Sequence, residues 1–547
     1  MRKHSLLLLA VTFLMMVSVF VSVAADAQEQ GTLIIGSSSQ VDSLNPFTSV
    51  YQVYFGTLRW VYDFLYQMDG HGKPIPDLAK DVSISDDGLT YTFTIRDDAK
   101  YHDGTPLTAY DGEFSYNYII SNGLGFYTAY TAPIESVKAL DDYTLEIKFT
   151  ERMTESWLNY NTFMWVPFFP KHIWENKSAD EALGEVPIED LVGSGPFQWV
   201  EFKSDELIRL KSYDWTYAQP LVDQVIIKMF ASESTMVQSL KAGEIDIALS
   251  VPEGTVNSLL ELPAISVKSS PSYWIQDVIY NSYTPSYEEG RKTHPHPALQ
   301  DPRVRRAMSW ALDKALLINL IHVGFATAGN QWLPPAYGEL SNTSLDPIGF
   351  DLDKANQILD EAGYKDTDGD GIRETEDGLP LVFDLWTPND TQINTGEIWA
   401  RSLKDVGIKL NVSLMDSGTL WSHMPMVWDF DIAIWSWVGD PDADFLFSVL
   451  ACDQVSDAGW SDCGYCNPAY DVLYAQQRTA ATFDERKQIA WKLQEILYND
   501  MPYDVLFNVS WVDAWRNDNI KGNFELGDPS YSLLNKWFIL SVAKTGL

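Results

Sequence analysis

Several short segments of the chain alternate apolar and polar residues, as half-buried β-strands do. Tyr91–Ile95 follows the turn residues Asp86-Asp87-Gly88, and Thr144–Phe149 follows a second acidic pair. Thr32–Gly36 and Val225–Ile227 are short continuous apolar runs, which predict buried strands. The first half of the chain is therefore expected to contain both half-buried strands and fully buried strands.

Other segments have helical spacing. Met236, Val237 and Leu240 recur as on one face of a helix over Ser234–Ala242, with Ser232 or Ser234 as N-cap and Gly243 at its end. A strand is expected directly afterwards, over Ile245–Ala248.

The second half of the chain continues the alternation of helices and strands. Asp301-Pro302 provides an N-cap and a proline at the first helical position. Then follow an expected strand at Phe383–Trp386, a helix at Ile398–Val406 and a strand at Ile408–Val412. Mixed strands and helices without a repeat predict an α/β protein with more than one lobe. The proline-rich and charged segment Ser282–Pro297 is the best candidate for a connector and hinge between lobes.

The N-terminus predicts export. A short basic start precedes an almost unbroken apolar run, Leu6–Ala25, and small residues at Ala25 and Ala27 suit a signal peptidase. The alternative is a retained membrane anchor, because a run of this length can span a bilayer. No Cys follows the apolar run, so the usual lipoprotein attachment is excluded.

Charge and composition restrict the partners. The formal net charge is −38, which argues against nucleic acid and anionic lipid surfaces as partners. Aromatic residues make up 13% of the 547 residues, so a wholly disordered chain is excluded and some rings are expected to line a surface or cleft.

The three cysteines lie close together in the sequence. An oxidising compartment permits one disulfide and one remaining thiol, and we prefer the pair Cys452–Cys466. Cys463 and Cys466 have the spacing of a redox or zinc motif, but a second pair of ligands for zinc is lacking.

An acidic loop has the spacing of a calcium site. Aspartates stand at its first, third and fifth positions, a glycine at the sixth and an acid at the twelfth. The expected ligands are Asp366, Asp368, Asp370, the Ile372 carbonyl and Asp377. The ion would be structural, and no other cofactor is expected. The alternative is an acidic surface turn.

A series of motifs in the expected order resembles the oligopeptide/dipeptide/nickel-binding family of extracytoplasmic solute-binding proteins of ABC importers, solute-binding protein family 5. The resemblance runs from about Leu33 to the C-terminus. Its landmarks are Ser43-Leu44-Asn45-Pro46, Asp77-Leu78-Ala79 with Ser85–Tyr91, His102–Ala109, Pro170–Trp174, Gly193–Phe197, Ala242–Asp246, Asp301–Ala307, Gly407-Ile408, Trp435–Asp442 and Gly464–Pro468.

This resemblance implies a two-lobed periplasmic-binding-protein fold of type II, in the large class with three subdomains, mixed sheets and a hinge. The expected parts are a signal peptide (1–27), three pieces of lobe I (28–63, 192–280 and 502–547), a subdomain inserted into lobe I (64–191) and lobe II (281–501). Gly193-Ser194-Gly195-Pro196 is expected to be a structural turn, because the Lys that would follow in a phosphate loop is absent.

The expected ligand site lies at the end of an alternating strand that reaches Trp437. Asp440 and Asp442 lie in the acidic turn that follows, and in peptide-binding relatives an Asp of this turn pairs with the α-ammonium of the ligand. Asp440 is the first candidate, and a helix N-cap is the alternative for Asp442.

Aromatic residues are the further candidates for the cleft, with ordinary core packing as the alternative. They are Tyr273, Trp274, Trp332, Trp435 and Trp437, to which we add Asn45 of the first landmark.

The resemblance implies a monomeric receptor, not an enzyme, that captures peptides by lobe closure and delivers them to a membrane permease. It would work outside the cytoplasmic membrane, in the periplasm or at the cell surface. Oligosaccharides are the alternative ligand, since aromatic rings also stack on sugars. A secreted glycoside hydrolase is the less supported alternative, because acidic pairs are common in this chain.

Overall fold

The computed structural model describes residues 31–49, 51–215, 217–283, 295–425, 427–456 and 459–545. The predicted signal segment Met1–Ala27 lies outside these residues. Over the described ranges, no helix is both long and apolar enough to cross a membrane.

Two lobes share one mixed sheet of 11 strands. Its order is β15 (Lys409–Leu414), β14 (Val382–Thr387), β16 (Ile432–Val438), β12 (Ile265–Tyr280), β17 (Tyr503–Arg516), β11 (Ile247–Ala248), β1 (Thr32–Ser37), β10 (Gln224–Met229), β9 (Leu207–Ser212) and β8 (Phe197–Lys203), with β13 (Ala326–Ala328) paired to β17. The first three strands belong to lobe II and the last five to lobe I.

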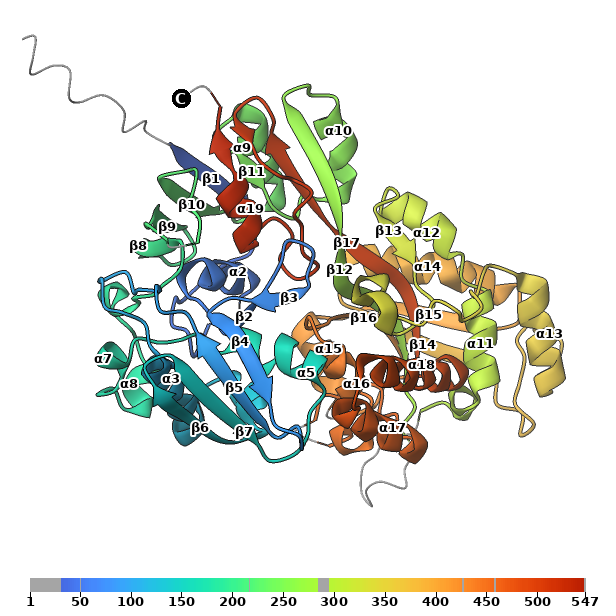
Figure 1. Cartoon of the computed structure of the whole chain (residues 1–547). Helices are drawn as coiled ribbons and strands as arrows, with labels where there is room; N and C mark the ends of the chain where they lie inside the picture. Colours follow the sequence, from blue (N-terminus) through green and yellow to red (C-terminus); the bar gives the residue numbers. More distant parts are fainter. Residues whose placement is uncertain are drawn as a thin grey trace, which may run out of the picture.

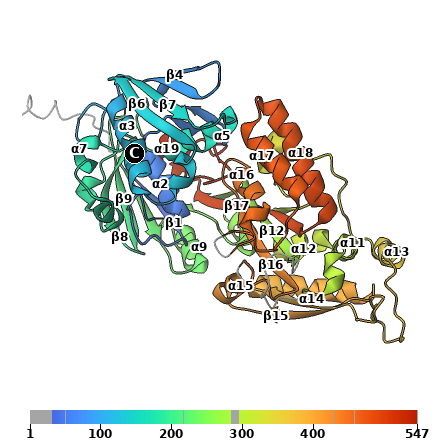
Figure 2. The ribbon, with the colours of Figure 1, turned by 90° about the horizontal axis from the view of Figure 1, so that it is seen from below.

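The strands β12 and β17 cross from one lobe to the other (Figure 1). Residues Ile265–Pro271 of β12 pair with Arg516–Ser510 of β17 in lobe I, and Trp274–Tyr280 pair with β16 in lobe II. The register shifts between Pro271 and Ile275, which is where the chain passes between the lobes. Seen from below, the two lobes lie on either side of this crossing (Figure 2).

The expected connector Ser282–Pro297 does not join the lobes. The amide of Ser282 donates to the carbonyl of Cys463, and the amide of His296 donates to Asp431. Both partners lie in lobe II, and residues 284–294 lie outside the described structure. The crossing inside β12 escaped prediction because Ser269-Ser270-Pro271-Ser272 interrupts any alternating pattern, so the sequence does not indicate one continuous strand there.

A separate four-stranded antiparallel sheet lies within residues 64–191, which the resemblance assigns to an inserted subdomain. Its order is β4 (Ala79–Ile84), β5 (Thr90–Ile95), β7 (Thr144–Phe149) and β6 (Ile134–Asp141). The hairpin β2 (Tyr66–Met68) and β3 (Pro74–Pro76) precedes it. The helices of this part are α3 (Ala109–Asn122), α4 (Tyr127–Thr131), α5 (Glu155–Tyr160), α6 (Thr162–Trp165), α7 (Lys171–Trp174) and α8 (Ala179–Leu183).

The remaining helices of lobe I cover its part of the large sheet. They are α2 (Gln52–Val61), α9 (Glu233–Ala242), α10 (Val256–Leu260) and α19 (Lys536–Ser541), and the short strands β18 (Ile520–Lys521) and β19 (Ala543–Lys544) complete the C-terminal return. One apolar core extends from α2 and β1 through the inserted sheet, so the two parts of lobe I are packed together.

Lobe II has a separate apolar core on each face of its strands. Ile275 and Trp437 belong to one core, while Val278 and Ile434 belong to the other. Its helices are α11 (Pro302–Trp310), α12 (Lys314–Ile321), α13 (Leu352–Ala362), α14 (Asp390–Lys404), α15 (Ser417–His423), α16 (Asp444–Ser448), α17 (Pro468–Thr479) and α18 (Phe483–Asp500). This two-sided α/β arrangement agrees with the predicted fold class.

Local signals in the sequence placed several helix ends correctly. Ser232 accepts from the amide of Thr235 at the start of α9, and Gly243 ends that helix in the left-handed conformation. Asp301 caps α11 as expected. By contrast, α14 begins eight residues before the expected Ile398, because Asn389 caps it by accepting from the amide of Gln392.

The glycines of the Gly193–Pro196 turn permit a close approach between chain segments. A Cβ on Gly193 would lie 1.9 Å from the carbonyl oxygen of Val61. The ring of His102 bridges the turn, with Nδ1 accepting from the amide of Gly193 and Nε2 lying 3.0 Å from the Gly195 carbonyl oxygen. Burial lowers the pKa of His102 to about 4, so the neutral imidazole is a structural element at pH 7.

The structure contains a disulfide between Cys452 and Cys466, the pair preferred from the sequence. Cys463 is a buried free thiol, and burial raises its pKa to about 12. A buried thiol with a raised pKa is unreactive, which agrees with a structural interpretation of this cysteine group.

Asp277 is a fully buried carboxyl group in the crossing strand β12. Both of its oxygens lack a hydrogen-bond partner within the described residues. Burial raises its pKa well above the usual value, and the nearby carboxylates of Asp462 and Asp504 add to the effect. The folded protein therefore holds Asp277 protonated under conditions in which the unfolded chain ionises it.

We expect Asp277→Asn to stabilise the protein at pH 8 by more than about 1 kcal/mol, because the amide does not ionise and one unit of pKa difference corresponds to about 1.4 kcal/mol. A raised pKa in the folded state means that stability falls as pH rises above the unfolded value, so the gain should shrink at pH 4. Urea unfolding at pH 8 and pH 4 measures the change in the free energy of unfolding. Asp81→Asn, at an exposed position of β4, is the control. Equal effects of the two substitutions at both pH values would contradict this account.

Candidate functional site

The acidic turn after β16 lies at the contact between the two lobes. Asp440 is partly buried, and the hydroxyl of Tyr130 in α4 donates to its Oδ2 at 3.2 Å. Its backbone carbonyl accepts from the hydroxyl of Tyr337. Within the described chain, no lysine, arginine or histidine forms an ion pair with Asp440, so this carboxylate at the cleft has no cationic partner.

Burial raises the pKa of Asp440 to about 6, and the neighbouring carboxylates Asp442 and Asp444 also raise it. The hydrogen bond from Tyr130 acts in the opposite direction. A carboxylate in this position is suited to bind a cation, because a positive charge would relieve both the desolvation and the repulsion.

Asp442 has a different role. It is fully buried, and its two oxygens accept from the Nη1 and Nη2 atoms of Arg486 in α18, each at 2.6 Å. Its Oδ1 also accepts from the amide of Asp444, at the start of α16. Asp442 is thus occupied by an internal bidentate pair and a cap, and we do not assign it to a ligand.

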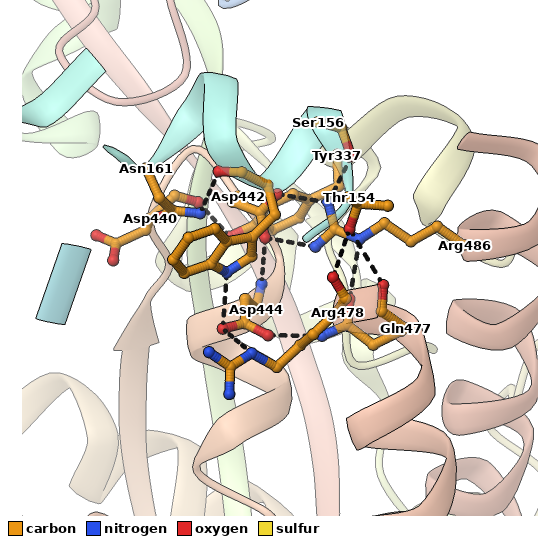
Figure 3. A network of polar contacts seen from close by, with 11 residues as sticks. Thr154, Ser156, Asn161, Tyr337, Asp440, Asp442, Asp444, Gln477, Arg478 and Arg486 are labelled. Atoms are coloured by element: carbon orange, nitrogen blue, oxygen red, sulfur yellow. Dashed lines mark hydrogen bonds and ion pairs between the residues drawn. The ribbon is translucent and has the colours of Figure 1, made fainter. Parts of the chain in front are cut away.

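Hydrogen bonds around this pair connect lobe II to α5 of the inserted subdomain (Figure 3). Arg486 donates to Oγ of Ser156 at 2.8 Å, and the indole of Trp157 donates to Asp444 at 3.0 Å. The carboxylate of Asp440 points away from this network (Figure 3). The network therefore joins the lobes and leaves Asp440 available.

The strand β16 has an unpaired edge. It pairs with β12 over its whole length, whereas β14 pairs with it only at Ile432 and Ala433. The segment Ile434–Val438 therefore has no neighbouring strand on its other side within the described structure. A strand edge of this kind can accept an extended chain by backbone hydrogen bonds.

A cavity of about 480 Å³ lies beside this segment, between the lobes. Lobe I contributes Glu233 and the loop Ser250–Glu253, and the crossing strands contribute Trp274, Gln276 and Trp511. Lobe II contributes Ser436, His322 and the N-terminal end of α14. The volume is within the usual range of small-molecule sites, about 300–1,000 Å³.

The predicted aromatic residues divide into two groups. Trp274 lines the cavity, and Trp435 is partly exposed and stacks on Trp421 of α15. Tyr273, Trp332 and Trp437 are buried in the core of lobe II. Tyr273, Trp332 and Trp437 are therefore core residues, which is the alternative interpretation of these side chains.

Asn45 is also engaged within the protein. Its amide nitrogen donates to the carbonyls of Ala182 and Gly184, and its Oδ1 accepts from the amide of Phe47. The side chain holds the first landmark loop against α8, so we do not assign it to a ligand.

The acidic loop brings four carboxylates within 4.8 Å of one another: those of Asp366, Asp368, Asp370 and Glu374. Glu374 replaces the expected Asp377 in this cluster. The amide of Glu374 donates to the carbonyl of Lys365, so the chain folds back after Ile372 and carries Asp377 into the next, exposed turn. Bound calcium, with the Ile372 carbonyl as a further ligand, stays a prediction.

Sequence reasoning missed four functional positions: Tyr130, Glu374, Arg486 and the N-terminal end of α14. The spacing of Glu374, at the ninth position of the loop, could have identified it. The other three come from segments distant in the sequence, and the printed chain has no local signal that pairs them with β16.

Comparisons with known proteins agree with this geometry. The family model described as "Bacterial extracellular solute-binding proteins, family 5 Middle" matches residues 73–457. This chain belongs to that family. A similar curated relative is the oligopeptide-binding protein AppA of Bacillus subtilis, 26% identical over 541 residues, which cover 92% of this chain and 93% of AppA.

Solved structures of similar proteins share the fold. AppA of B. subtilis, in complex with a nonapeptide, has a TM-score of 0.72 at 24% identity and covers 94% of this chain and 98% of its own. The substrate-binding protein CtaP of Listeria monocytogenes has a TM-score of 0.79 at 23% identity. The match covers 95% of this chain and 100% of the CtaP chain. The predicted family and the predicted fold class are both confirmed.

We expect Ser156→Ala to shift the ligand-free protein toward more open conformations, because Arg486 then loses a hydrogen bond across the lobes. Bonds to a charged group contribute about 1.5–3 kcal/mol. Fluorescence resonance energy transfer between two dyes, one on each lobe, measures the distribution of distances between the lobes. Ser204→Ala is the control, because Ser204 is exposed within lobe I. An unchanged distribution would show that this contact does not hold the lobes together.

We expect calcium to raise the melting temperature of the protein after treatment with a chelator, and Asp368→Ala to remove this effect. Calcium would bind through oxygen atoms of the carboxylate cluster and stabilise the folded state that binds it. Differential scanning calorimetry with and without calcium is the measurement. A melting temperature of the unmutated protein that does not respond to calcium would exclude a structural site.

Proposed function

We propose that this protein is the substrate-binding component of an ABC importer, and that it captures peptides between its lobes and releases them intact to a membrane permease. It would do so as a monomer outside the cytoplasmic membrane. The observation that carries the proposal is the carboxylate of Asp440, which has no cationic partner among the described residues and lies at the end of a strand whose outer edge is unpaired within the same residues.

Each part of an extended peptide has a counterpart in this geometry. Asp440 and Tyr130 offer an acceptor and a hydroxyl to an α-ammonium group. The edge at Ile434–Val438 offers backbone donors and acceptors to the following residues. Asp440 is four residues beyond Ser436, about 13 Å in an extended chain, so a peptide of about four residues would reach from the carboxylate to the cavity.

The comparisons support the same ligand class. Similar relatives include proteins named for oligopeptide binding and a glutathione-binding protein of Shigella flexneri, 22% identical over 517 residues. Delivery to a permease follows from the family's role in transport, and no catalytic step is proposed.

The test is calorimetric titration with a panel of peptides and a panel of oligosaccharides, followed by mass spectrometry of the recovered ligand. The proposal expects saturable binding of peptides and their recovery intact. If only oligosaccharides bound, the ligand would be a sugar and not a peptide. If the recovered ligand were cleaved, the protein would be an enzyme and not a receptor.

We expect the affinity for peptides with a free N-terminus to fall about tenfold from pH 7 to pH 5, because Asp440, with its pKa raised to about 6, becomes protonated and the ion pair is lost. Asp440→Asn should reduce affinity at pH 7 by a similar factor and abolish the pH dependence. Asp453→Asn, an exposed acid in lobe II, is the matched control. If Asp440→Asn retained full affinity at pH 7, Asp440 would not be the ammonium site.

A further inference from the structure

The cavity beside β16 has polar atoms without partners. The Trp274 Nε1, His322 Nε2 and Gln392 Oε1 atoms form no hydrogen bond to any described residue. His322 and Gln392 are 8% and 4% exposed. All three residues line the cavity, and a polar ligand group that reached these atoms would offset the cost of leaving them unpaired.

Most of these atoms are acceptors. His322 holds its Nδ1 atom 2.7 Å from a carboxylate oxygen of Glu253. When Nδ1 carries the proton and donates it to Glu253, the Nε2 atom of the neutral ring is left as an acceptor. The Oε1 atom of Gln392 is a second acceptor. A ligand group that donates several hydrogen bonds therefore suits the part of the cavity formed by His322 and Gln392 better than a group that accepts them.

Apart from His322, which contacts Glu253, the ionisable residues around the cavity are acidic. Glu233 and Glu253 line it from lobe I, and Asp390 is the first residue of α14. Among the described residues that line the cavity there is no lysine and no arginine. Such a site disfavours a carboxylate, even though the N-terminal end of α14 lies in its wall.

Two indoles complete the cavity. Trp274 and Trp511 have ring centroids 5.9 Å apart with their planes at 49°. Indole faces attract ammonium and guanidinium groups, and more strongly when the cation is desolvated. The indole N–H of Trp274 remains as a donor for a backbone carbonyl of the same ligand.

We infer that this cavity binds the basic side chain of the captured peptide, so that the protein selects lysine- or arginine-containing peptides. The inference rests on the proposed peptide-binding function and specifies the class of peptide. The cation would contact the acceptors Glu253 and Gln392 and the face of an indole, while the α-ammonium of the same peptide pairs with Asp440.

The experiment uses tetrapeptides with alanine at three positions and lysine, norleucine or glutamate at the fourth, with the variable residue placed at each position in turn. Norleucine has nearly the length of lysine without its charge. We expect lysine at one position to bind about tenfold more tightly than norleucine, as one charged contact would produce, and glutamate to bind more weakly than both.

A matched pair of variants shows whether the preference arises in the cavity. Glu253→Gln should reduce the ratio of lysine to norleucine affinity at that position by at least about threefold, and because the result is a ratio, any general change in peptide affinity cancels. Glu261→Gln, an exposed acid of the same lobe, should leave the ratio unchanged.

The outcomes separate this inference from the proposed function. If peptides bind but lysine has no advantage at any position, or has the same advantage at all four, the cavity does not select a basic side chain. A ratio unchanged by Glu253→Gln also overturns the inference. If no peptide of any series binds, the proposed peptide-binding function itself fails.

Discussion

The two lobes are connected by one pair of antiparallel strands, β12 and β17, and the backbone hydrogen bonds between these strands continue through both lobes. The regular pairing is interrupted between Pro271 and Ile275 and again between Gln276 and Asp277, and these are the places where the pair can best bend if the lobes move. The cavity and the unpaired edge of β16 adjoin this crossing. A rotation about it would open or close the ligand site, and the core of lobe II that contains Tyr273 and Ile275 reaches into the crossing.

Electrostatics gives the three acids after β16 different roles. Asp442 is neutralised by the buried guanidinium of Arg486, and Asp444 accepts a hydrogen bond from Trp157 of the opposite lobe. Among the described residues, the carboxylate of Asp440 has only the Tyr130 hydroxyl as side-chain partner. Because burying an unpaired charge is costly, this arrangement leaves one carboxylate that gains from a cationic ligand. A closed state with such a ligand would be more stable than one without it, which is the physical basis of capture by lobe closure.

Local patterns predicted the elements well and the contacts between them poorly. Alternation located β5 and β7, and the cap signals at Ser232 and Asp301 located α9 and α11, because these features depend on neighbouring residues. The acidic turn was also identified, but the sequence alone does not distinguish the roles of Asp440, Asp442 and Asp444. Arg486, which distinguishes Asp442 from Asp440, lies 44 residues away from its partner. The crossing inside β12 and the return of Glu374 over the acidic loop likewise depend on pairings that no local pattern specifies.

The central claim is that the lobes rotate about β12 and β17 to enclose a peptide. Small-angle X-ray scattering of the protein, with and without saturating peptide, tests it most directly. The account predicts a smaller radius of gyration when peptide is bound. Identical scattering profiles, measured under conditions in which calorimetry shows the peptide to be bound, would contradict it.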